Sequence, residues 1–464
     1  MSSYSSPRAN TPRLNRRKLY RTQDIVEGVG WLSILYVVFT FLINGGVAGV
    51  KDLQTALGSI ERLTALVATM LLLIQVLLIS RVPWIDQLYG HDRATQTHKK
   101  LGKPVLYLVL VHVVAVIWSY SLTDGVGVVD EFLSLINVIP EILLATIALV
   151  LMVTVVLASI KISRKKLSYE AWYLVHLLGY GAVMLAIPHQ LVVGVDIAGK
   201  PLAQYFWIAA YLFVAMNILW FRLLSPIVLS ATHKLVVSEV KTESSDSVSV
   251  SISGKKLDAF NAQAGQFFIV RFITGTFWWR AHPFSLSAKP TADKFRFTIG
   301  NRGDDTALLQ NIKVGTKVIL EGPYGVFTES RRAEDNVVLI AAGIGAPPIR
   351  ALAESIDTNG KVDIIYRVRK KDDAALLQEL EEISSSRGFK LHVVEGSRRS
   401  DNSWLPWSFN QSISDEKALE QMVPKIKKAD VYICGPAKFT EGVVKSLKKI
   451  GTPKDQIHAE EFAW

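Results

Sequence analysis

Cysteine is nearly missing from this chain: Cys434 is the only one among 464 residues. A single cysteine excludes an internal disulfide framework, a cysteine-ligated iron–sulfur centre and haem attachment through a CxxCH motif. Charged residues are also scarce, at 20%, whereas hydrophobic residues make up 50%. Apolar content this high collapses into a core or enters a membrane, so the composition excludes a disordered chain and is unusual for a soluble protein of this size.

Long apolar runs are what the first half of the chain contains instead. Six of them lie at roughly 31–50, 62–80, 104–120, 141–160, 170–191 and 204–224. Each is near the ~20 residues that a helix needs to cross the hydrocarbon of a bilayer. Buried helices of a soluble domain are the alternative, but they are mostly shorter and rarely come six in succession. We therefore predict an all-α bundle of six transmembrane helices in a plasma or inner membrane.

Basic residues are unevenly distributed over the segments that join these runs. With the N-terminus in the cytoplasm, the inside segments carry fifteen Lys and Arg residues, against Lys51, Arg62 and Lys200 outside. This asymmetry follows the positive-inside rule and explains much of the net charge of +11 without nucleic acid as a partner. The prediction places the N-terminus and everything after Pro226 in the cytoplasm.

The second half changes character near residue 230 and again near residue 330. Between them, short β-rich runs separated by Gly, Asp and Lys turns predict a small antiparallel β-barrel. Beyond them, strand-like runs alternate with helical segments, which indicates an α/β doubly wound parallel sheet. The predicted domains are a disordered tail over 1–22, the membrane domain over 23–230, the barrel over 231–330 and the doubly wound domain over 331–464.

Four of the nine histidines fall on two predicted helices, His98 and His112 on the third and His176 and His189 on the fifth. Their separations of 14 and 13 residues are about 21 and 20 Å along a helix, so each helix carries one near either face. We name His98 and His176 the inner pair, and His112 and His189 the outer pair. Two histidines at one depth can ligate a planar metal centre from both sides, which favours b-type haem over tetrahedral zinc. A lone histidine would more simply form an interhelical hydrogen bond.

The fifth helix poses a geometric difficulty for this hypothesis. At about 100° per residue, its two histidines point about 140° apart around the helix axis. Pro188, next to His189, is a place for a kink or local unwinding that re-aims the second histidine. The sequence therefore predicts a distortion there.

Four short motifs follow one another in the second half: HPFS at 282–285, GPYG at 322–325, GIGAPP at 343–348 and CGP at 434–436. Their order resembles that of the ferredoxin–NADP reductase superfamily. Joined to a six-helix, four-histidine membrane domain, they resemble a prokaryotic-type member of the NADPH oxidase and ferric reductase family. The resemblance implies FAD and NADPH as cofactors in the soluble half and two haem b in the membrane half.

On this resemblance, the barrel binds FAD, and the catalytic candidate Ser285 lies beside the reactive edge of the flavin. The alternative for Ser285 is a strand-end hydroxyl that bonds its own backbone. The turn at Gly303 resembles a pyrophosphate-contacting turn, although many relatives carry a basic residue where this chain has Gly300, and Arg302 is the substitute. The FAD-binding candidates are Arg280, His282, Pro283, Phe284, Ser285, Arg302, Gly303, Asp304, Thr306, Gly322, Tyr324 and Gly325.

The GIGAPP loop follows an apolar strand and precedes a helical run, the context that a dinucleotide-binding loop requires. The resemblance places the catalytic candidate Cys434 against the nicotinamide; a small buried hydrophobe is the alternative. Tyr366 and Arg367, at the end of the domain's second strand, are expected to hold a 2′-phosphate with the help of Arg398, and so to favour NADPH over NADH. The NADPH-binding candidates are Gly343, Gly345, Pro347, Tyr366, Arg367, Arg398, Cys434, Gly435 and Pro436.

The chain ends in two aromatic residues, and the resemblance implies that one of them stacks on the flavin until nicotinamide displaces it. Phe462 is the first catalytic candidate and Trp464 the second. Docking of an aromatic residue merely for packing is the alternative.

The resemblance implies an NAD(P)H oxidase or ferric-chelate reductase that moves electrons from cytoplasmic NADPH through FAD and two b-type haems to dioxygen or a ferric chelate outside. No obligatory protein partner is expected. A membrane cytochrome that passes electrons to a partner protein or quinone stays open as a second class, and a transporter or receptor as a third.

Overall fold

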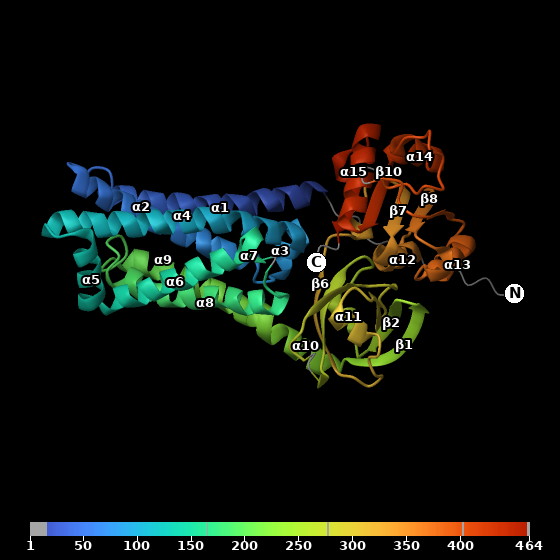
Figure 1. Cartoon of the computed structure of the whole chain (residues 1–464), viewed down its shortest axis with the longest axis horizontal. Coiled ribbons are helices and arrows are strands. Elements are labelled where there is room, and N and C mark those ends of the chain that lie inside the picture. The colour runs from blue at the N-terminus through green and yellow to red at the C-terminus, as the bar shows by residue number, and fades with distance from the viewer. Residues whose placement is uncertain (1–15, 165, 276–277, 401–402, 462–464) are drawn as a thin grey trace. The chain divides into compact units, whose positions relative to one another are not determined.

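The computed structural model describes residues 16–164, 166–275, 278–400 and 403–461 (Figure 1). Two compact units divide the chain: Tyr20–Phe221, which we name the membrane unit, and a second unit made of Arg222–Trp464 with Met1–Leu19. We name Arg222–Trp464 the nucleotide unit and describe each unit by itself.

Six helices of the described chain are long and apolar enough to cross a membrane, which confirms the predicted number. Their hydrophobic windows lie in Arg17–Ile43, Leu53–Leu78, His91–Asp124, Pro140–Ser159, Glu170–Val192 and Pro201–His233. The helices of the membrane unit are α1 (Arg16–Ile43), α2 (Leu53–Leu78), α3 (Pro83–Tyr89), α4 (His91–Asp124), α5 (Val128–Val138), α6 (Pro140–Ser159), α7 (Lys161–Arg164), α8 (Tyr169–Val192) and α9 (Pro201–Asn217), followed by the π-helical η1 (Ile218–Leu224).

Helix α1 begins at Arg16, inside the stretch 1–22 that the sequence analysis assigned to a disordered tail. Residues 16–22 are therefore helical, and that boundary was wrong; residues 1–15 lie outside the described chain. The Ser, Pro, Arg and Asn content of residues 1–22 had suggested a disordered tail, but the helix that contains the first apolar run extends back to Arg16.

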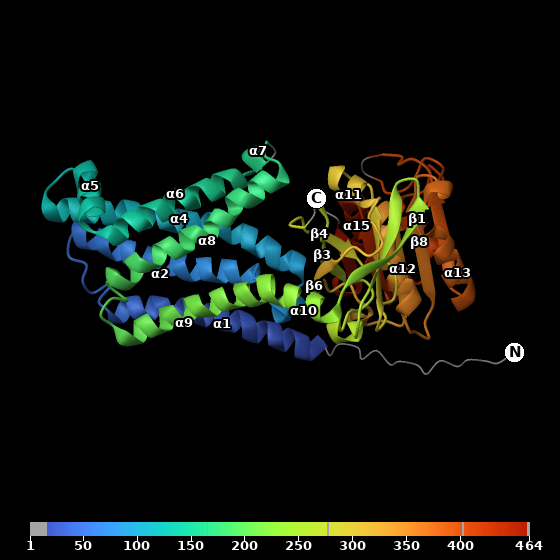
Figure 2. The same cartoon turned by 90° about the horizontal axis from the view of Figure 1, so that it is seen from below.

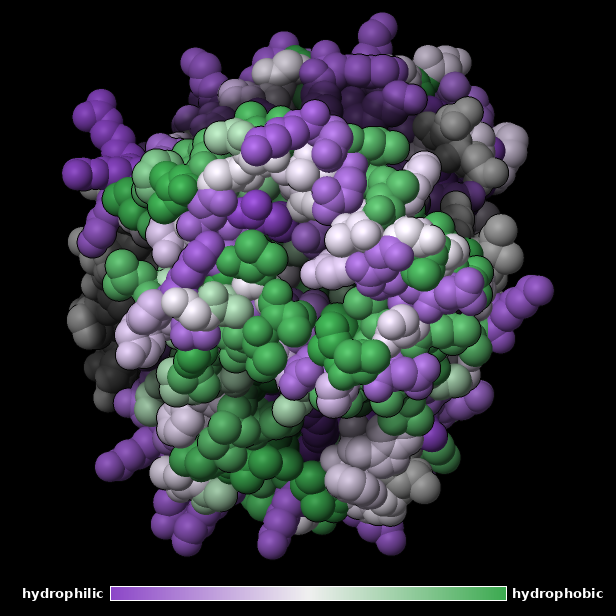
Figure 3. All heavy atoms as spheres, turned by 90° about the vertical axis from the view of Figure 1, so that its left-hand side faces the viewer, coloured by the Kyte–Doolittle hydropathy of each residue, from purple (hydrophilic) through white to green (hydrophobic). Residues whose placement is uncertain are grey.

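Paired helices form the body of the membrane unit, with α2 packed along α4 and α6 along α8 (Figure 2). A capping box starts α2, because the Thr55 amide donates to Asp52 Oδ1 at 2.9 Å and the Asp52 amide donates to Thr55 Oγ1 at 3.0 Å. Large apolar side chains such as Val129 and Leu202 are exposed. Hydrophobic side chains also cover much of the end where α5 lies (Figure 3). An apolar exterior is what a bilayer requires.

Two three-stranded antiparallel sheets form the first part of the nucleotide unit, in the orders β1-β2-β5 and β4-β3-β6. Single bridges, Val236 to Lys317 and Leu286 to Phe297, link the two sheets. Apolar side chains from both sheets share one core. Among the described residues, the domain predicted as an antiparallel barrel therefore consists of two sheets packed around that core. The elements are α10 (Ser225–His233), β1 (Val236–Ser244), β2 (Ser247–Ser253), β3 (Phe267–Phe272), β4 (His282–Ser285), β5 (Lys294–Gly300), α11 (Asp304–Leu309) and β6 (Val318–Tyr324).

A five-stranded parallel sheet in the order β11-β10-β7-β8-β9 forms the rest of the nucleotide unit, which confirms the α/β doubly wound prediction. Alternate residues of β7 enter different cores: Leu339 belongs to the one with α12 and α13, and Ile340 to the one with α14 and α15. The elements are β7 (Asn336–Ala342), α12 (Ala346–Ser355), β8 (Val362–Val368), α13 (Leu377–Arg387), β9 (Lys390–Glu395), α14 (Asp415–Met422), β10 (Ala429–Gly435), α15 (Ala437–Ile450) and β11 (Ile457–Glu461).

Candidate functional site

The inner pair of histidines meets between two helices of the membrane unit. His98 comes from α4 and His176 from α8, and their ring centroids are 6.0 Å apart with the ring planes at 64°. Metal–imidazole bonds of about 2 Å, added to a ring radius of about 1 Å on each side, place two rings that share one metal about 6 Å apart. The spacing of these rings therefore fits a metal ion between them.

Three of the four histidines have Nδ1 hydrogen-bonded to a protein oxygen. The Nδ1 atom of His98 is 2.9 Å from the Gln75 carbonyl, that of His112 is 3.0 Å from the Glu61 carbonyl, and that of His176 is 3.3 Å from Ser159 Oγ. A ligating histidine commonly uses its second nitrogen in this way, because the hydrogen bond fixes the tautomer and the orientation of the ring. With Nδ1 engaged in this way, Nε2 is the nitrogen that would bind a metal.

The outer pair is less symmetric. His189 lies close enough to His112 for an electrostatic interaction, but its buried Nδ1 has no hydrogen-bond partner among the described residues. Helix α8 stays helical through Pro188 to Val192, so the predicted local unwinding does not occur. The described residues contain no group of three or more His, Cys, Asp or Glu side chains suited to a metal ion. Two imidazoles supply fewer protein ligands than a structural zinc site uses, whereas a haem iron needs only two ligands from the protein.

In the nucleotide unit, HPFS forms strand β4, which pairs with β3 from His282 to Ser285. Ser285 is 5% exposed, and its Oγ atom has no hydrogen-bond partner in the described part of the chain. Burying a hydroxyl without a hydrogen-bond partner costs free energy, because its hydrogen bonds to water are lost. A bound ligand that hydrogen-bonds to the hydroxyl offsets this cost. This observation favours the ligand role of Ser285 over a strand-end hydroxyl that bonds its own backbone.

Charged side chains surround the next FAD-binding candidates. Arg280 pairs with Asp305, and His282 Nε2 is 3.8 Å from the same carboxylate. Asp304 and Thr306 lie in α11 behind Gly303, and the Arg302 amide donates to Thr306 Oγ1 at 2.7 Å. Pro283 and Phe284 lie in β4, and Gly322, Tyr324 and Gly325 lie at the end of β6 or just after it.

Gly300 packs against the GIGAPP loop. A Cβ atom there would lie 2.8 Å from Ile344 Cδ1, which is the end of a flexible side chain. A larger residue at position 300 would therefore require the Ile344 side chain to shift.

Two glycine-containing motifs meet at adjacent strand ends. The GIGAPP loop follows β7 and CGP ends β10, and these neighbouring strands lie where the strand order reverses. Dinucleotides bind at such switch points in doubly wound sheets. A Cβ atom on Gly345 would lie 2.0 Å from the Cys434 carbonyl oxygen, so only glycine allows this approach. Pro347 lies in the first turn of α12, Gly435 is the last residue of β10, and Pro436 directly precedes α15.

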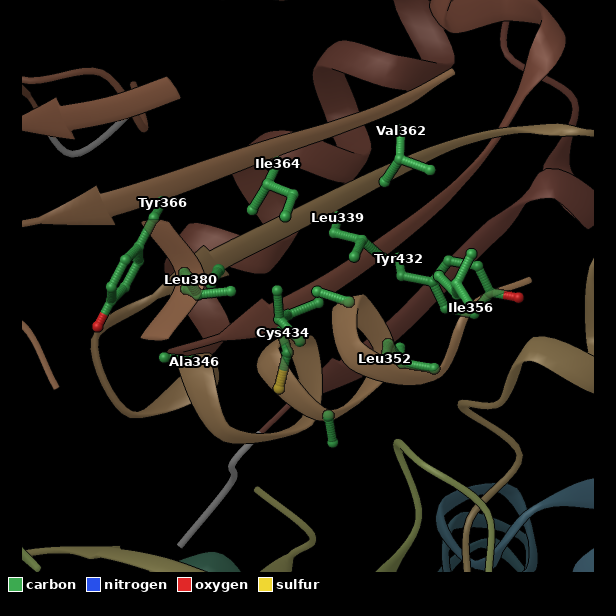
Figure 4. Packing of buried hydrophobic residues seen from close by; sticks show 14 of the residues in the cluster. Leu339, Ala346, Leu352, Ile356, Val362, Ile364, Tyr366, Leu380, Tyr432 and Cys434 are labelled. Carbon is green, nitrogen blue, oxygen red and sulfur yellow. The ribbon is translucent and has the colours of Figure 1, made fainter. Parts of the chain in front are cut away.

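Cys434 is fully buried in the core beneath the sheet, among residues that include Ala346 and Leu352 (Figure 4). Burial, followed by the negative charge of Glu460, raises the pKa of the thiol well above its usual range. The thiol is therefore neutral and shielded, as the small-hydrophobe alternative describes.

Glu460 is a candidate that the sequence analysis missed. It is 8% exposed, pairs with Cys434 between β11 and β10, and places Oε1 3.4 Å from the Cβ position of Gly325. A carboxylate is thus held beside both the GPYG and CGP motifs. Reading Ile457–Glu461 as a fifth parallel strand after α15 would have revealed this position.

The three side chains proposed for the 2′-phosphate differ in accessibility. Tyr366 is buried, and its hydroxyl donates to the Ala375 carbonyl at 2.9 Å. Arg367 is 9% exposed and donates through Nε to the Trp404 carbonyl at 3.2 Å. Burial, and then the positive charge of Arg398, lowers the pKa of Arg367. Arg398 is the more accessible guanidinium, and two neighbouring cations favour an anion. Phe462 and Trp464 lie outside the described residues.

Three protein families match successive parts of the chain. Residues 64–187 match the ferric reductase like transmembrane component, residues 233–328 an FAD-binding domain, and residues 339–445 the oxidoreductase NAD-binding domain. The first match covers α4 with His98 and His112, and α8 as far as residue 187, so it includes His176 but ends before His189. The other two matches cover the two antiparallel sheets and most of the parallel sheet.

Among similar proteins, the glycine betaine monooxygenase reductase subunit of Chromohalobacter salexigens is 29% identical over 39% of this chain and 50% of its own length. The flavohemoprotein of Vibrio cholerae is 30% identical over 39% of this chain and 45% of its own. The chain thus spans about half the length of these curated relatives. A solved FAD/NAD-binding domain of nitric oxide dioxygenase from Vibrio cholerae has a TM-score of 0.41 at 26% identity, covering 49% of this chain and 97% of that one.

The three matched domains occur in membrane-to-nucleotide order along one chain. Together, these domains identify the protein as a membrane oxidoreductase that binds FAD and NAD(P). The chain thus combines a ferric reductase-like transmembrane domain with FAD- and NAD-binding domains, as in ferric reductase/NADPH oxidase-like fusions.

Proposed function

We propose that this protein moves electrons from cytoplasmic NADPH, through FAD and two b-type haems, to dioxygen or a ferric chelate on the outer side of the membrane. The observation that carries the proposal is the inner pair of histidines, whose ring centroids lie 6.0 Å apart in a chain that also has FAD- and NAD-binding domains. An interhelical hydrogen bond would account for either histidine alone. It would not account for two imidazole rings at the distance expected when both bind one metal ion.

The residues have separate tasks in this proposal. His98 and His176 hold the inner haem, and His112 and His189 hold the outer one. Ser285 binds the flavin ring through its unpartnered hydroxyl, while the Gly345 loop and the N-terminus of α12 bind the NADPH pyrophosphate. When bound, FAD accepts a hydride and releases electrons singly to haem iron, which carries one electron at a time.

Orientation follows from the charges of the chain. The fifteen basic residues in the inside segments favour a cytoplasmic N-terminus, and an even number of crossings puts the nucleotide unit on the same side. Cytoplasmic NADPH then reaches its domain directly.

The decisive experiment is anaerobic addition of NADPH to the purified, FAD-loaded protein while the haem absorption bands are recorded. We expect reduction of both haems without another protein, followed by reoxidation with dioxygen or a ferric chelate. Superoxide-dismutase-sensitive cytochrome c reduction identifies an oxidase, whereas ferrous chelate formed without oxygen identifies a ferric reductase. Haems that stay oxidised would favour a cytochrome that depends on a partner protein or quinone.

A further inference from the structure

One histidine of the outer pair lies against an acidic residue. His112 contacts Glu61 through its Nδ1 atom. The Nδ1 atoms of the inner pair contact the Gln75 carbonyl and the Ser159 hydroxyl. Glu61 therefore places a carboxylate directly behind a proposed ligand of the outer haem.

Glu61 contacts His112 through two of its atoms. The Nδ1 atom of His112 is 3.0 Å from the Glu61 backbone carbonyl and 3.4 Å from the side-chain Oε2. The side chains of His112 and Glu61 are 21% and 16% exposed, respectively. Within the described chain, His112 is the ion-pair partner of this carboxylate. Water therefore screens the charge only in part.

The neighbouring cation Arg62 directs its hydrogen bonds away from Glu61. Arg62 donates through Nε and Nη2 to Asp196 at 2.9 and 2.6 Å, and through Nη2 to the Asn44 carbonyl at 3.2 Å. The Asp196 side chain is 3% exposed and also accepts from Asn44 Nδ2 at 3.0 Å. Arg62 still interacts with Glu61 through its charge, but Asp196 is its direct ion-pair partner, and the Glu61 carboxylate lies against His112.

We propose that Glu61 is a positioning residue for the outer haem: its carboxylate, as a fixed negative charge, orients His112 and holds the reduction potential of that haem down. The inference rests on the proposed function, because it requires haem at the outer pair. A carboxylate behind a ligating imidazole makes the imidazole more basic, and a nearby negative charge favours ferric over ferrous iron. The outer haem is consequently a stronger reductant for the final acceptor than its histidines alone would make it.

The test compares potentiometric titrations of the haem bands in the parent, in Glu61→Gln and in a control, Glu141→Gln. Glu141 lies in the first turn of α6, and no hydrogen bond or ion pair joins it to the four histidines among the described residues. The outer haem is assigned as the component missing from a His112→Ala protein. Glu61→Gln is expected to raise the ferrous-to-ferric ratio of the outer haem about tenfold at fixed potential, a shift of about 59 mV for one electron. The inner haem and the control should not move.

Low-spin electron paramagnetic resonance adds a second readout, because a weaker ligand field at His112 shifts the g values of the outer haem. Should Glu61→Gln fail to retain that haem, Glu61→Asp is compared instead. Retention by Asp, with a potential near that of the parent, supports the charge; loss in both variants means that the side chain only supports folding and overturns the inference.

Two further outcomes separate the inference from the function beneath it. Two haems in the parent with an unmoved outer potential in Glu61→Gln overturn the role of Glu61 and leave the proposed function intact. A parent without haem overturns the proposed function itself.

Discussion

In the membrane unit the candidate site consists of four imidazole side chains on two helices, whereas in the nucleotide unit it consists largely of backbone at strand ends. The proposed role of His98 and His176 depends on the atoms of their own imidazole rings. Gly345 and Gly435 act by allowing two chain segments to approach each other. The first kind of site depends on side-chain chemistry and the second on shape, so they should respond differently to substitution.

The largest effect is expected from the membrane side of this comparison. His176→Ala should remove one of two haems and abolish electron transfer to the outer acceptor, because one imidazole is lost from the inner pair. Haem stoichiometry by the pyridine haemochrome method measures it. His91→Ala, at the start of α4, removes a histidine outside the two pairs and is the control, which should keep both haems; an unchanged spectrum in His176→Ala would break the comparison.

Gly345→Val tests the backbone side. Its Cβ atom would lie 2.0 Å from a main-chain oxygen, which cannot rotate away. Overpacking of this kind costs about 1–3 kcal/mol. We expect a lower thermal unfolding midpoint and loss of most NADPH-driven flavin reduction.

Gly442→Ala, in α15 of the same unit, is the control for Gly345→Val. Its added methyl would lie 3.7 Å from Trp404 Cβ, an ordinary contact. If both glycine variants behave alike, the tight approach at Gly345 is unimportant.

An ion cluster sharpens the comparison within the nucleotide unit, where it joins the antiparallel sheets to the parallel one. Glu379 accepts from Arg296 at 2.9 and 2.8 Å, and Arg350 Nε lies 2.7 Å from it. Burial opposes ionisation of Glu379, but the hydrogen bond and charge of Arg296 prevail and lower its pKa. Its contribution to stability is thus present above the unfolded pKa of about 4.3 and is lost as the pH falls through the lower folded value.

Glu379→Gln should lower the free energy of unfolding at pH 7 by about 1–3 kcal/mol, since hydrogen bonds to charged groups are lost. Chemical denaturation at several pH values measures both the loss and its acid dependence. The exposed Glu381, on the same helix, provides the control Glu381→Gln. Equal acid sensitivity of the parent and Glu379→Gln would refute the assignment.

The smallest effect concerns nucleotide choice. Arg398→Ala should raise the KM for NADPH several-fold, up to about tenfold, because a charge-assisted hydrogen bond to the 2′-phosphate is lost. NADH lacks that phosphate and serves as the internal control. Equal changes for both nucleotides, measured by steady-state kinetics, would remove Arg398 from the site.

Long, uniform features could be predicted from sequence, and single contacts could not. Six apolar runs of membrane-spanning length predicted the six long helices, and the strand–helix alternation after residue 336 predicted the parallel sheet. The structure confirms both. Cys434 and Tyr366 were expected at the nucleotide but lie in the core, because strand residues alternate between faces and the face depends on neighbouring elements. Glu460 was missed because its strand is only five residues long and gives a weak sequence signal.

Hydrophobic length and motif order are local properties, so the sequence by itself determined the membrane helices, the two nucleotide folds and the histidine positions. Contacts between distant residues required the tertiary structure. They include Glu61 beside His112, Gly345 against Cys434, and Glu379 between Arg296 and Arg350. Each depends on how separate elements pack, and packing distances of a few ångströms decide which charge acts on which site.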